Sequence, residues 1–405
     1  MAQTQQSGPL AGLKVIELAH IMAGPVCGLM LADLGADVIK VEKTPDGDDT
    51  RRMLPPDIDG ESAAYMILNR NKRGTAINLK HPEGRDALMR LLKDADAVIE
   101  NYRPGTMERL GLGYETLARE NPGLIYCQIT GFGLTGPYAG RAGFDLISQG
   151  MSGLMSLTGE GPGRPPVKVG VPVGDITAGI LAAKAILAAY INRLKTGKGQ
   201  RLDTSLLEAS MVHTYWPAAI FLATGESPGP MGTAHPISAP YQSFETADGW
   251  VNVGAANQAN WLRLLKVLGA EHLADDERFR QNVDRRQNLA ELVEELTPLF
   301  RTRITAEWME LLDEGGVPAG PVWTIGEALT SPQASAREML VSVDHPRLGP
   351  VRTMGVPVKF SDTPGGVRRH APMLGEHTRE ILGEAGYGAQ QIEDLARDGA
   401  VITAE

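Results

Sequence analysis

An aspartate at the start of a long helix-favouring stretch is the residue of this chain best placed to do chemistry. Asp175 follows the loop-forming residues 171–174 and directly precedes an alanine- and leucine-rich stretch over 176–194. The unpaired N–H groups and the dipole of a first helical turn favour the charged form of a carboxylate. An ionised, fixed carboxylate can attack an activated acyl group as a nucleophile. Aspartate is also a preferred N-cap, and on this position alone that structural role is the simpler interpretation.

Cations recur after successive predicted strands of the first hundred residues, where an α/β protein binds its ligands. They are Lys43, Arg51, Arg52, Arg70, Lys72, Arg73, Arg103 and Arg109. A solvated basic face explains any one of them, but a multiply phosphorylated nucleotide needs several together. Asn101 and Tyr102 directly precede Arg103, so an amide and an aromatic ring lie beside that cation, suited to orienting and stacking a base.

The loop of residues 19–25 lies between a predicted strand and a predicted helix, a place where α/β proteins hold phosphates. Its glycines do not fit the GxGxxG spacing, because Pro25 and Val26 interrupt it. Glu42 ends the next strand as in dinucleotide binders, but Lys43 follows at once and suits phosphate better than ribose. NAD binding is therefore not expected.

Strand- and helix-favouring segments alternate over the first 130 residues, which is typical of an α/β fold with a mostly parallel sheet. Strands are predicted over 13–18, 38–42, 75–79, 97–100 and 124–129, and helices over 25–34, 83–94 and 114–120. Each strand–helix–strand unit implies a right-handed crossover. We therefore expect a large Rossmann-like domain.

A second, smaller α+β domain is predicted within the large one, since 405 residues exceed the usual size of one core. The turn-rich residues 225–240 are predicted to form a linker. Residues 241–316 are predicted to form the small domain, which begins with a hairpin over 241–253. Residues 317–330, rich in proline and glycine, form the return linker. The large domain then comprises 1–224 and 331–405, with a strand over 350–354 and a helix over about 376–382.

Composition excludes several classes of protein. The net charge of -10 argues against a general nucleic-acid binder, although a local basic site for a phosphorylated ligand is compatible with it. Two cysteines cannot form a disulfide framework, and no Cys/His cluster suggests zinc or another metal. Residues 1–8 lack the features of a signal peptide, and the most apolar stretch, 176–191, contains Lys184. We expect a cytoplasmic protein that does not bind a membrane.

Nine short segments together carry a family resemblance. They are residues 10–18, 23–25, 34–42, 69–73 (Asn-Arg-Asn-Lys-Arg), 100–105 (Glu-Asn-Tyr-Arg-Pro-Gly), 174–175 (Gly-Asp), 196–200 (Thr-Gly-Lys-Gly-Gln), 239–241 (Ala-Pro-Tyr) and 372–378 (Pro-Met-Leu-Gly-Glu-His-Thr). Each is short, but they run in family order over essentially the whole chain. The chain resembles the family III CoA-transferases (CaiB/BaiF), which include formyl-CoA:oxalate CoA-transferase and carnitine CoA-transferase.

The resemblance implies a covalent mechanism with Asp175 as the nucleophile. The carboxylate attacks an acyl-CoA thioester, giving an aspartyl–acyl anhydride and CoA thiolate, which then forms an aspartyl-CoA thioester. The acceptor acid attacks next, and CoA moves onto it. Splitting one hard exchange into steps of similar energy is the benefit of covalent catalysis. The anhydride must be kept from water, so a closed site with a covering loop is expected.

The resemblance also implies which residues bind CoA, the substrate, with no permanently bound cofactor. The loop residues His20, Ile21, Met22 and Ala23 would hold the pantetheine, although a structural role for His20 is equally compatible. The adenosine phosphates would be bound by Lys43, Arg73, Asn101, Tyr102, Arg103 and Arg109. The family further implies an interlocked homodimer, an arrangement that nothing in composition or periodicity suggests.

Two alternatives stay open. The family fold includes α-methylacyl-CoA racemases, which place a histidine in a Gly-His-Asp motif; here the same place reads Gly143-Phe144-Asp145, and phenylalanine cannot exchange a proton. The chain could also be a non-catalytic CoA-binding protein, although binding alone does not require Asp175. Asp145 and Glu100 are further acids expected near the site. We interpret both as structural, with Asp145 a candidate supporting residue.

The acceptor is predicted to be a short dicarboxylic acid, with succinyl-CoA as donor. Arg141 or His235 would meet its distal carboxylate. Met22 stands where formyl-CoA transferase has glutamine, and residues 232–238 (Gly-Thr-Ala-His-Pro-Ile-Ser) replace that enzyme's glycine run. Specificity for formyl or oxalyl groups is therefore not expected.

Overall fold

The computed structural model describes residues 8–404. Most of the segment on which the signal-peptide prediction rests, residues 1–7, lies outside the described residues. The chain divides into two compact units. The first holds the residues up to Leu154, Lys168–Ala218 and the residues from Pro332 onward, and the second holds Met155–Val167 and Ala219–Ser331. The predicted domain and linker boundaries stay a prediction.

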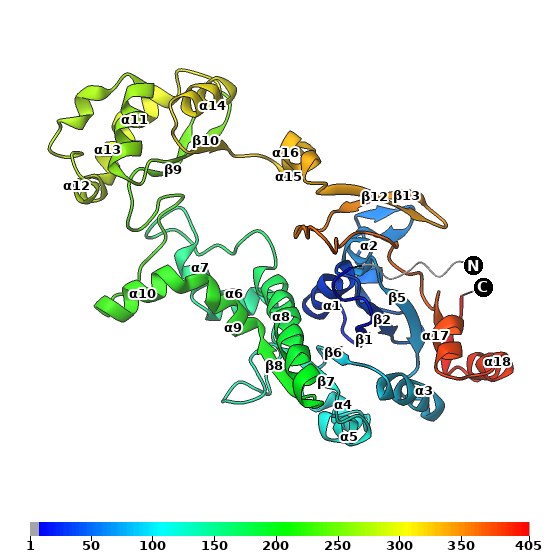
Figure 1. Ribbon diagram of the computed structural model, residues 1–405. Helices are drawn as coiled ribbons and strands as arrows, with labels where there is room; N and C mark the ends of the chain where they lie inside the picture. The colour runs from blue at the N-terminus through cyan, green and yellow to red at the C-terminus, as the bar shows by residue number, and fades with distance from the viewer. Residues whose placement is uncertain (1–7, 405) are drawn as a thin grey trace. The chain divides into compact units, whose positions relative to one another are not determined.

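A seven-stranded sheet forms the centre of the first unit (Figure 1). Its strands, in spatial order, are β14 (Val401–Ile402), β5 (Arg73–Ile77), β2 (Asp37–Glu42), β1 (Lys14–Glu17), β6 (Ala97–Glu100), β7 (Ile125–Thr130) and β8 (Arg201–Ser205). All neighbouring pairs are parallel except β14 with β5. This confirms the predicted α/β class with a mainly parallel sheet, whereas the edge strands β8 and β14 were not predicted.

The strand order reverses at the middle of this sheet. The chain builds outward from β1 to β2 and β5, then returns to the other side of β1 to add β6, β7 and β8. The loops that follow β1 and β6 therefore run in opposite directions from two adjacent strands. In open α/β sheets, ligands bind in the crevice at the carboxyl ends of such strands.

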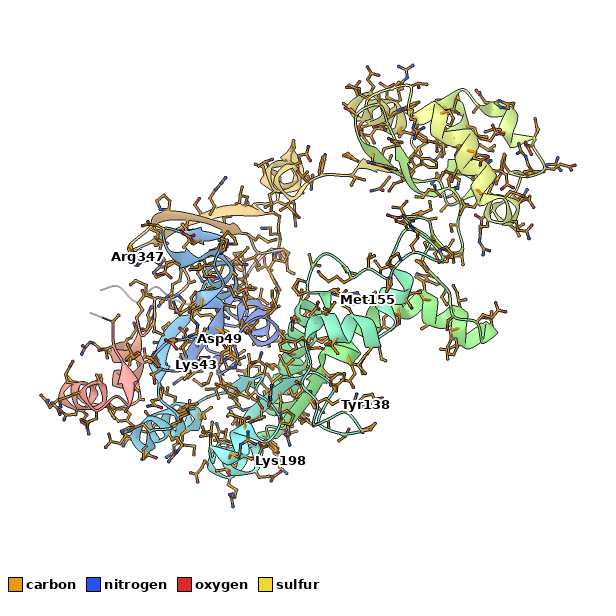
Figure 2. All side chains as sticks on the ribbon, turned by 180° about the vertical axis from the view of Figure 1, so that it is seen from behind. Lys43, Asp49, Tyr138, Met155, Lys198 and Arg347 are labelled. Carbon is orange, nitrogen blue, oxygen red and sulfur yellow. The ribbon has the colours of Figure 1, made fainter. Side chains whose placement is uncertain are left out.

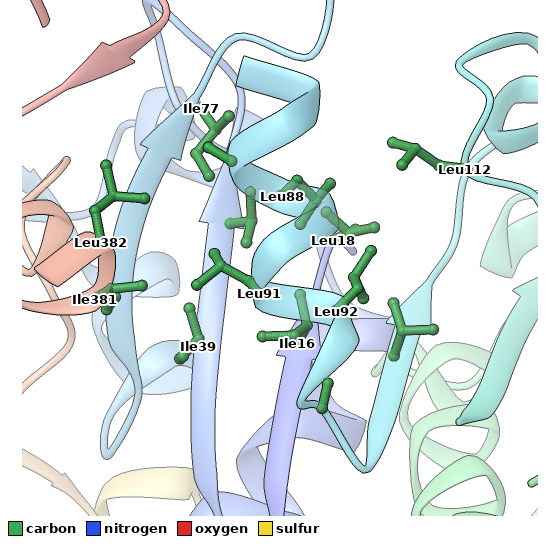
Figure 3. Close-up of a cluster of buried hydrophobic side chains, with 14 of the residues drawn as sticks. Ile16, Leu18, Ile39, Ile77, Leu88, Leu91, Leu92, Leu112, Ile381 and Leu382 are labelled. Carbon is green, nitrogen blue, oxygen red and sulfur yellow. The ribbon is translucent and has the colours of Figure 1, made fainter. Parts of the chain in front are cut away.

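Alternating side chains of the strands enter two separate cores, because successive residues of a strand point to opposite faces. Ile16 lies in the core under α3 (Pro82–Lys93), α5 (Tyr114–Glu120), α17 (Thr378–Glu384) and α18 (Ala389–Arg397), which Figure 3 shows in part. Val15 lies in the opposite core, under α1 (Ala23–Asp33) and α8 (Val173–Thr196). Both faces of the sheet are thus covered by helices.

Helix α8 is long and apolar enough to cross a membrane by length and composition alone. Its alanines Ala178, Ala182 and Ala189 are nevertheless buried against α1 and the sheet. The core helix of a globular unit passes the same test, so this observation is weak support for a membrane span.

The remaining elements of the first unit are short. They are η1 (Asp49–Arg52), β3 (Asp57–Ile58), β4 (Glu61–Ser62), α2 (Ala63–Asn69), α4 (Thr106–Arg109), α6 (Asp145–Met151), α9 (Leu206–Met211), η2 (Val212–Thr214), α16 (Pro332–Ala336), β12 (Leu340–His345) and β13 (Gly349–Met354). α7 (Leu154–Leu157) and α10 (Tyr215–Thr224) span the division between the units.

The second unit is an α+β structure with its own core. Antiparallel strands β9 (Tyr241–Glu245), β10 (Trp250–Gly254) and β11 (Ala319–Pro321) confirm the predicted hairpin. Its helices are α11 (Gln258–Leu268), η3 (Glu271–Ala274), α12 (Asn282–Gln287), α13 (Leu289–Phe300), α14 (Thr305–Glu314) and α15 (Ile325–Thr330). Trp261, Phe244 and Phe300 are fully buried in this core.

Candidate active site

The loops after β1 and β6 are hydrogen-bonded to each other at the point where the strand order reverses. Asn101 follows β6, and its side-chain oxygen accepts a hydrogen bond from the His20 backbone N–H at 2.9 Å. Its Nδ2 donates to the His20 carbonyl oxygen at 2.8 Å. Both polar groups of the Asn101 amide thus bind the loop, and the predicted contact of Asn101 with CoA stays a prediction.

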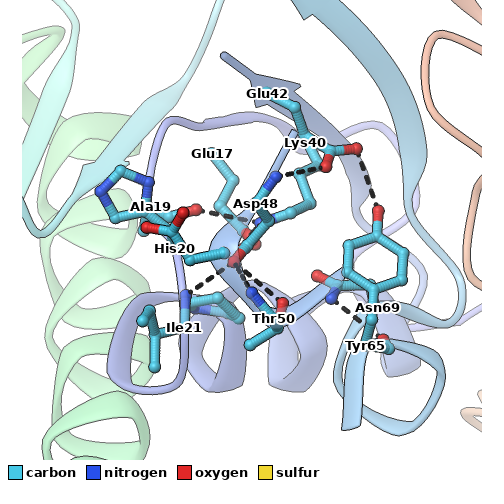
Figure 4. A network of polar contacts seen from close by, with 12 residues as sticks. Glu17, Ala19, His20, Ile21, Lys40, Glu42, Asp48, Thr50, Tyr65 and Asn69 are labelled. Carbon is cyan, nitrogen blue, oxygen red and sulfur yellow. Dashed lines mark hydrogen bonds and ion pairs between the residues drawn. The ribbon is translucent and has the colours of Figure 1, made fainter. Parts of the chain in front are cut away.

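A buried charged network fixes the same loop from the side of the sheet (Figure 4). Lys40 of β2 is fully buried, and its Nζ contacts Glu17 at 3.0 Å, Asp48 at 2.8 Å and the carbonyl of Ala19 at 3.0 Å. Asp48 in turn accepts a hydrogen bond from the Ile21 N–H at 3.1 Å. Ile21 has φ 68°, a left-handed conformation that costs a β-branched residue energy. The network therefore holds the loop in a shape that it would not adopt alone.

Four of the cations predicted to bind phosphates are largely buried and are bound by carboxylates inside the first unit instead, whereas Arg52 forms exposed ion pairs with Asp46 and Asp49. The pairs are Arg51 with Glu42, Arg70 with Asp33, Lys72 with Glu17, and Arg73 with Asp37, Glu380 and Glu384. The Arg73 side chain is 9% exposed and borders neither cavity described below. The prediction that Arg73 binds CoA phosphates is therefore not supported. A cation after a strand can equally balance carboxylates of the neighbouring strands, and the sequence does not separate these cases.

A cavity of about 380 Å³ lies over the reversal point and brings most of the predicted site residues together. Its lining includes His20, Ile21, Met22, Ala23, Asp49, Asn101, Tyr102, Arg103, Arg141, Phe144 and Asp175. Asp175 is the third residue of α8, whose N-cap is Pro172. Asp175 is thus in the first turn, as predicted, but it is not the N-cap, and the simple structural interpretation of this residue is wrong.

The protonation of Asp175 differs from the sequence expectation. Burial and, second, the negative charge of Asp145 raise the pKa of Asp175 to about 7. The helix N-terminus was expected to favour the ionised form, but in this site desolvation and the like charge prevail. The His20 imidazole borders the same cavity, and burial lowers its pKa, so the ring is neutral at pH 7.

A second cavity, of about 330 Å³, borders the carboxyl ends of β2 and β5. Lys43, Lys80 and Arg109 supply its cations, and Tyr102 borders both cavities. Lys43 forms an exposed ion pair with Asp49 at 2.7 Å (Figure 2), an interaction weak enough for a phosphate to replace. Sequence reasoning missed Lys80, although it follows β5 by three residues and the rule of cations after strands would have found it.

The two predicted acceptor-binding residues lie in different units. Arg141 borders the cavity with Asp175, and its guanidinium lies 4.2 Å from the ring centre of Tyr138. Within residues 8–404, no carboxylate forms an ion pair with Arg141, so its charge is available to an anion. His235 belongs to the second unit, where its ring packs against Tyr241, and its predicted role stays a prediction.

Glu100 ends β6 directly before the cavity residues. Burial raises its pKa to about 7, and it accepts hydrogen bonds from the Tyr102 N–H at 2.8 Å and the Tyr126 hydroxyl at 3.3 Å. It faces the protein interior and does not border either cavity. These contacts agree with the structural interpretation of Glu100.

Comparison with known proteins agrees with this geometry. The profile of CoA-transferase family III matches residues 10–378. Succinate–glutarate CoA-transferase of Agrobacterium fabrum is 42% identical, over 93% of this chain and 95% of the relative. Succinyl-CoA:mesaconate CoA-transferase of Haloarcula marismortui is 40% identical, over 95% of this chain and 99% of the relative. The crystal structure of a CaiB/BaiF family protein from Brucella suis superposes with a TM-score of 0.85 at 43% identity, covering 94% of this chain and 100% of that chain. The chain therefore belongs to CoA-transferase family III and is a CoA-transferase.

Proposed function

We propose that this enzyme transfers CoA from succinyl-CoA to a short dicarboxylic acid, with Asp175 as the nucleophile. The observation that carries this proposal is the position of the Asp175 carboxyl in the wall of one cavity, which shares Tyr102 with a second, cation-lined cavity. An acyl-CoA matches this pair of cavities, because it has a reactive thioester at one end and phosphates at the other. The two relatives compared above bear names that pair succinate or succinyl-CoA with glutarate or mesaconate.

The nucleotide end of CoA is proposed to bind in the second cavity. Lys43, Lys80 and Arg109 border it and can neutralise the phosphates, and Arg103 lies on the adjoining cavity wall. The pantetheine would then pass Tyr102 and run along the loop of residues 20–23 toward Asp175. Because the charged network below this loop fixes its backbone, the path is formed before CoA binds.

The helix N-terminus of α1 is proposed to stabilise the charge that develops on the thioester oxygen. Met22 and Ala23, at the start of α1, border the same cavity as Asp175. The N–H groups of a first helical turn have no acceptor within the helix and favour negative charge. Fixed donors of this kind are worth several kcal/mol when charge develops in a site shielded from water.

The chemistry would proceed through carboxylate exchange on Asp175. The Asp175 oxygen forms a bond to the thioester carbon, the carbon–sulfur bond breaks, and CoA leaves as the thiolate. The thiolate attacks the aspartyl carbonyl of the anhydride and releases succinate, leaving an aspartyl-CoA thioester. The acceptor carboxylate displaces the thiolate to form a second anhydride. The thiolate then attacks the acceptor's acyl carbon, which yields the new acyl-CoA and regenerates the Asp175 carboxylate.

Arg141 is proposed to select acceptors with a second carboxylate. Its guanidinium borders the same cavity as Asp175, is free of carboxylate partners among residues 8–404, and can form a bidentate pair with a distal carboxylate. A monocarboxylic acid would leave this cation unpaired. This contrast explains why a dicarboxylate would be preferred over a monoacid of the same length.

A homodimer, interlocked as the family resemblance implies, is part of the proposal. α6 with its N-cap residue Phe144, and α8, expose large apolar side chains, namely Phe144, Leu146, Ile147, Ile180, Ile191 and Leu194, with Leu194 69% exposed. Large exposed apolar side chains on two helices that contact each other are typical of an interface between subunits. Light scattering of the purified enzyme tests the proposal, and a monomer at micromolar concentration would contradict it.

The racemase alternative lacks the second proton-transfer group at the expected place. Phe144 borders the cavity and is 69% exposed, and its ring cannot accept a proton. The non-catalytic alternative leaves Asp175 without a role. Neither alternative is favoured by any contact that the structure shows.

An exchange assay tests the proposed function. Purified enzyme is incubated with succinyl-CoA and, separately, glutarate, mesaconate, oxalate, carnitine and butyrate, and new CoA thioesters are identified by mass spectrometry. We expect thioesters of the C4–C5 diacids with the wild-type enzyme and none with Asp175→Asn. Thioesters of carnitine or butyrate alone would refute the dicarboxylate preference. An absence of exchange, together with uptake of deuterium at the α-carbon of a branched acyl-CoA, would establish the racemase.

A further inference from the structure

A second aspartate is hydrogen-bonded to the residue that directly precedes the proposed nucleophile. Asp145 is the first residue of α6, and its Oδ1 accepts a hydrogen bond from the Gly174 backbone N–H at 2.8 Å. Its Oδ2 accepts a second one from Nε2 of Gln149 at 2.7 Å. Gly174 immediately precedes Asp175, so Asp145 contacts the backbone that carries the nucleophile.

The first turn of α8 has no side-chain cap of its own. Its N-cap residue is Pro172, which has no side-chain hydrogen-bonding group. The Gly174 N–H is one of the donors that a helix leaves without an internal acceptor. Asp145 supplies the missing acceptor from another helix, and in this way takes over the role of an N-cap residue.

The loop before α8 is anchored to the same helix through Gln149. This side chain is fully buried, donates to the Val171 carbonyl at 3.2 Å and accepts from the Val169 N–H at 2.9 Å. Gln149 thereby joins the loop to Asp145 as well as to α6. The chain entering α8 is thus held at residues 169, 171 and 174.

Close packing at Gly174 leaves the first turn of α8 no room to shift. A Cβ atom at this position would lie 2.7 Å from the Ser210 hydroxyl and 2.8 Å from the Ser148 hydroxyl. Those two hydroxyls are themselves hydrogen-bonded at 3.1 Å. Glycine is therefore required for α8 to approach α6 and α9 closely enough for the Asp145 contact.

We propose that Asp145 is a positioning residue for this enzyme, whose carboxylate fixes the first turn of α8 and places a second negative charge beside the nucleophile. The inference rests on the proposed role of Asp175. Its consequence is that Asp175 ionises at a higher pH than it would alone. A more basic carboxylate is also the stronger nucleophile once it is ionised.

Other charged groups around the pair come from several elements. His20, Asp49, Arg103 and Arg141 border the cavity with Asp175. On the helical segments packed against α6 and α8, Glu208 of α9 accepts a hydrogen bond from Ser205, and His213 of η2 contacts Thr177 at 2.7 Å. After burial, the charge of Asp145 is the main cause of the raised pKa of Asp175.

Two substitutions at Asp145 separate the effect of its negative charge on Asp175 from the effect of its hydrogen bond to the Gly174 backbone. Asp145→Asn keeps an oxygen acceptor for the Gly174 N–H but removes the charge and the acceptor of the Gln149 Nε2 donor. The loss of charge should move the acid limb of kcat/KM at least about half a pH unit lower. Asp145→Ala removes the acceptor as well. Losing an N-cap interaction of about 1 kcal/mol at the nucleophile should lower kcat at the pH optimum about fivefold, with KM for acyl-CoA changed less than about twofold.

The control is Asp203→Asn, which makes the same change of charge in the same unit while its hydrogen bond from the Leu134 N–H can persist. Each variant's folded fraction is measured by calorimetry, and kcat is expressed per folded enzyme. An unmoved acid limb in Asp145→Asn, or an unchanged kcat in Asp145→Ala, would overturn the inference. Full activity of Asp175→Asn would instead overturn the proposed function, so the two failures are distinguishable.

Discussion

Replacing Asp175 by asparagine should stabilise the first unit at neutral and alkaline pH. The pKa of Asp175 is raised from 3.8 to about 7 in the folded protein. Between pH 4 and 7 the folded state therefore binds more protons than the unfolded state, and stability falls as the pH rises through this window. A shift of about 3 pKa units corresponds to roughly 4 kcal/mol of destabilisation above pH 7, at about 1.4 kcal/mol per unit. An asparagine side chain in its place would carry no charge and avoid this cost.

Differential scanning calorimetry of the wild type and Asp175→Asn between pH 4.5 and 8.5 measures the effect. At about 2 °C per kcal/mol for a unit of this size, the variant should melt up to roughly 8 °C higher at pH 8, and this advantage should shrink toward pH 4.5. The matched variant Asp203→Asn should show no comparable growth with pH. A difference in melting temperature between the wild type and Asp175→Asn that is constant from pH 5 to 8 would refute the reasoning. Such a constant difference would come from packing of the amide, which does not depend on pH.

Four further outcomes are expected. The kcat/KM of the wild type should fall about tenfold per pH unit below a midpoint near pH 7, because protonated Asp175 cannot attack the thioester. A pH–rate profile that is flat between pH 5 and 8 would contradict this. Lys80→Ala should raise KM for succinyl-CoA about tenfold with little change in kcat, and the defect should weaken at high salt; steady-state kinetics at two ionic strengths test it. Asn101→Ala removes both hydrogen bonds to His20 and should cost about 2 kcal/mol of stability, measured by calorimetry beside Asp203→Asn. Arg141→Ala should raise KM for glutarate at least tenfold, and KM for succinyl-CoA can rise with it because the succinyl group also carries a distal carboxylate. Inhibition by free CoA should stay within about threefold, and an equal weakening of CoA binding would place Arg141 on CoA instead.

The parallel sheet and the loop over it were predictable because local patterns determine them. Strand β6 and helix α5 have the predicted bounds to the residue, since buried four-residue strands and amphipathic helices carry strong periodic signals. The first-turn position of Asp175 followed from the helix-favouring stretch behind it. The edge strand β14 was missed because two residues carry no detectable alternation.

The electrostatics of the site could not be predicted, because they depend on contacts between segments far apart in the sequence. Arg73 is neutralised by Glu380 and Glu384, more than three hundred residues away. Asp145 and Asp175 are thirty residues apart, and only the packing of α6 on α8 brings the first charge to the second. Direction and size of a pKa shift follow from burial, and burial follows from the tertiary fold.

The covalent intermediate on Asp175 tests the central claim most directly. The enzyme is mixed with succinyl-CoA without an acceptor, quenched in acid, and its intact mass and proteolytic peptides are measured, with Asp175→Asn treated in parallel. The account predicts an adduct of CoA or succinyl on the peptide that contains Asp175, discharged by glutarate and absent from the variant. An adduct on a different residue, or turnover to glutaryl-CoA by Asp175→Asn, would contradict it.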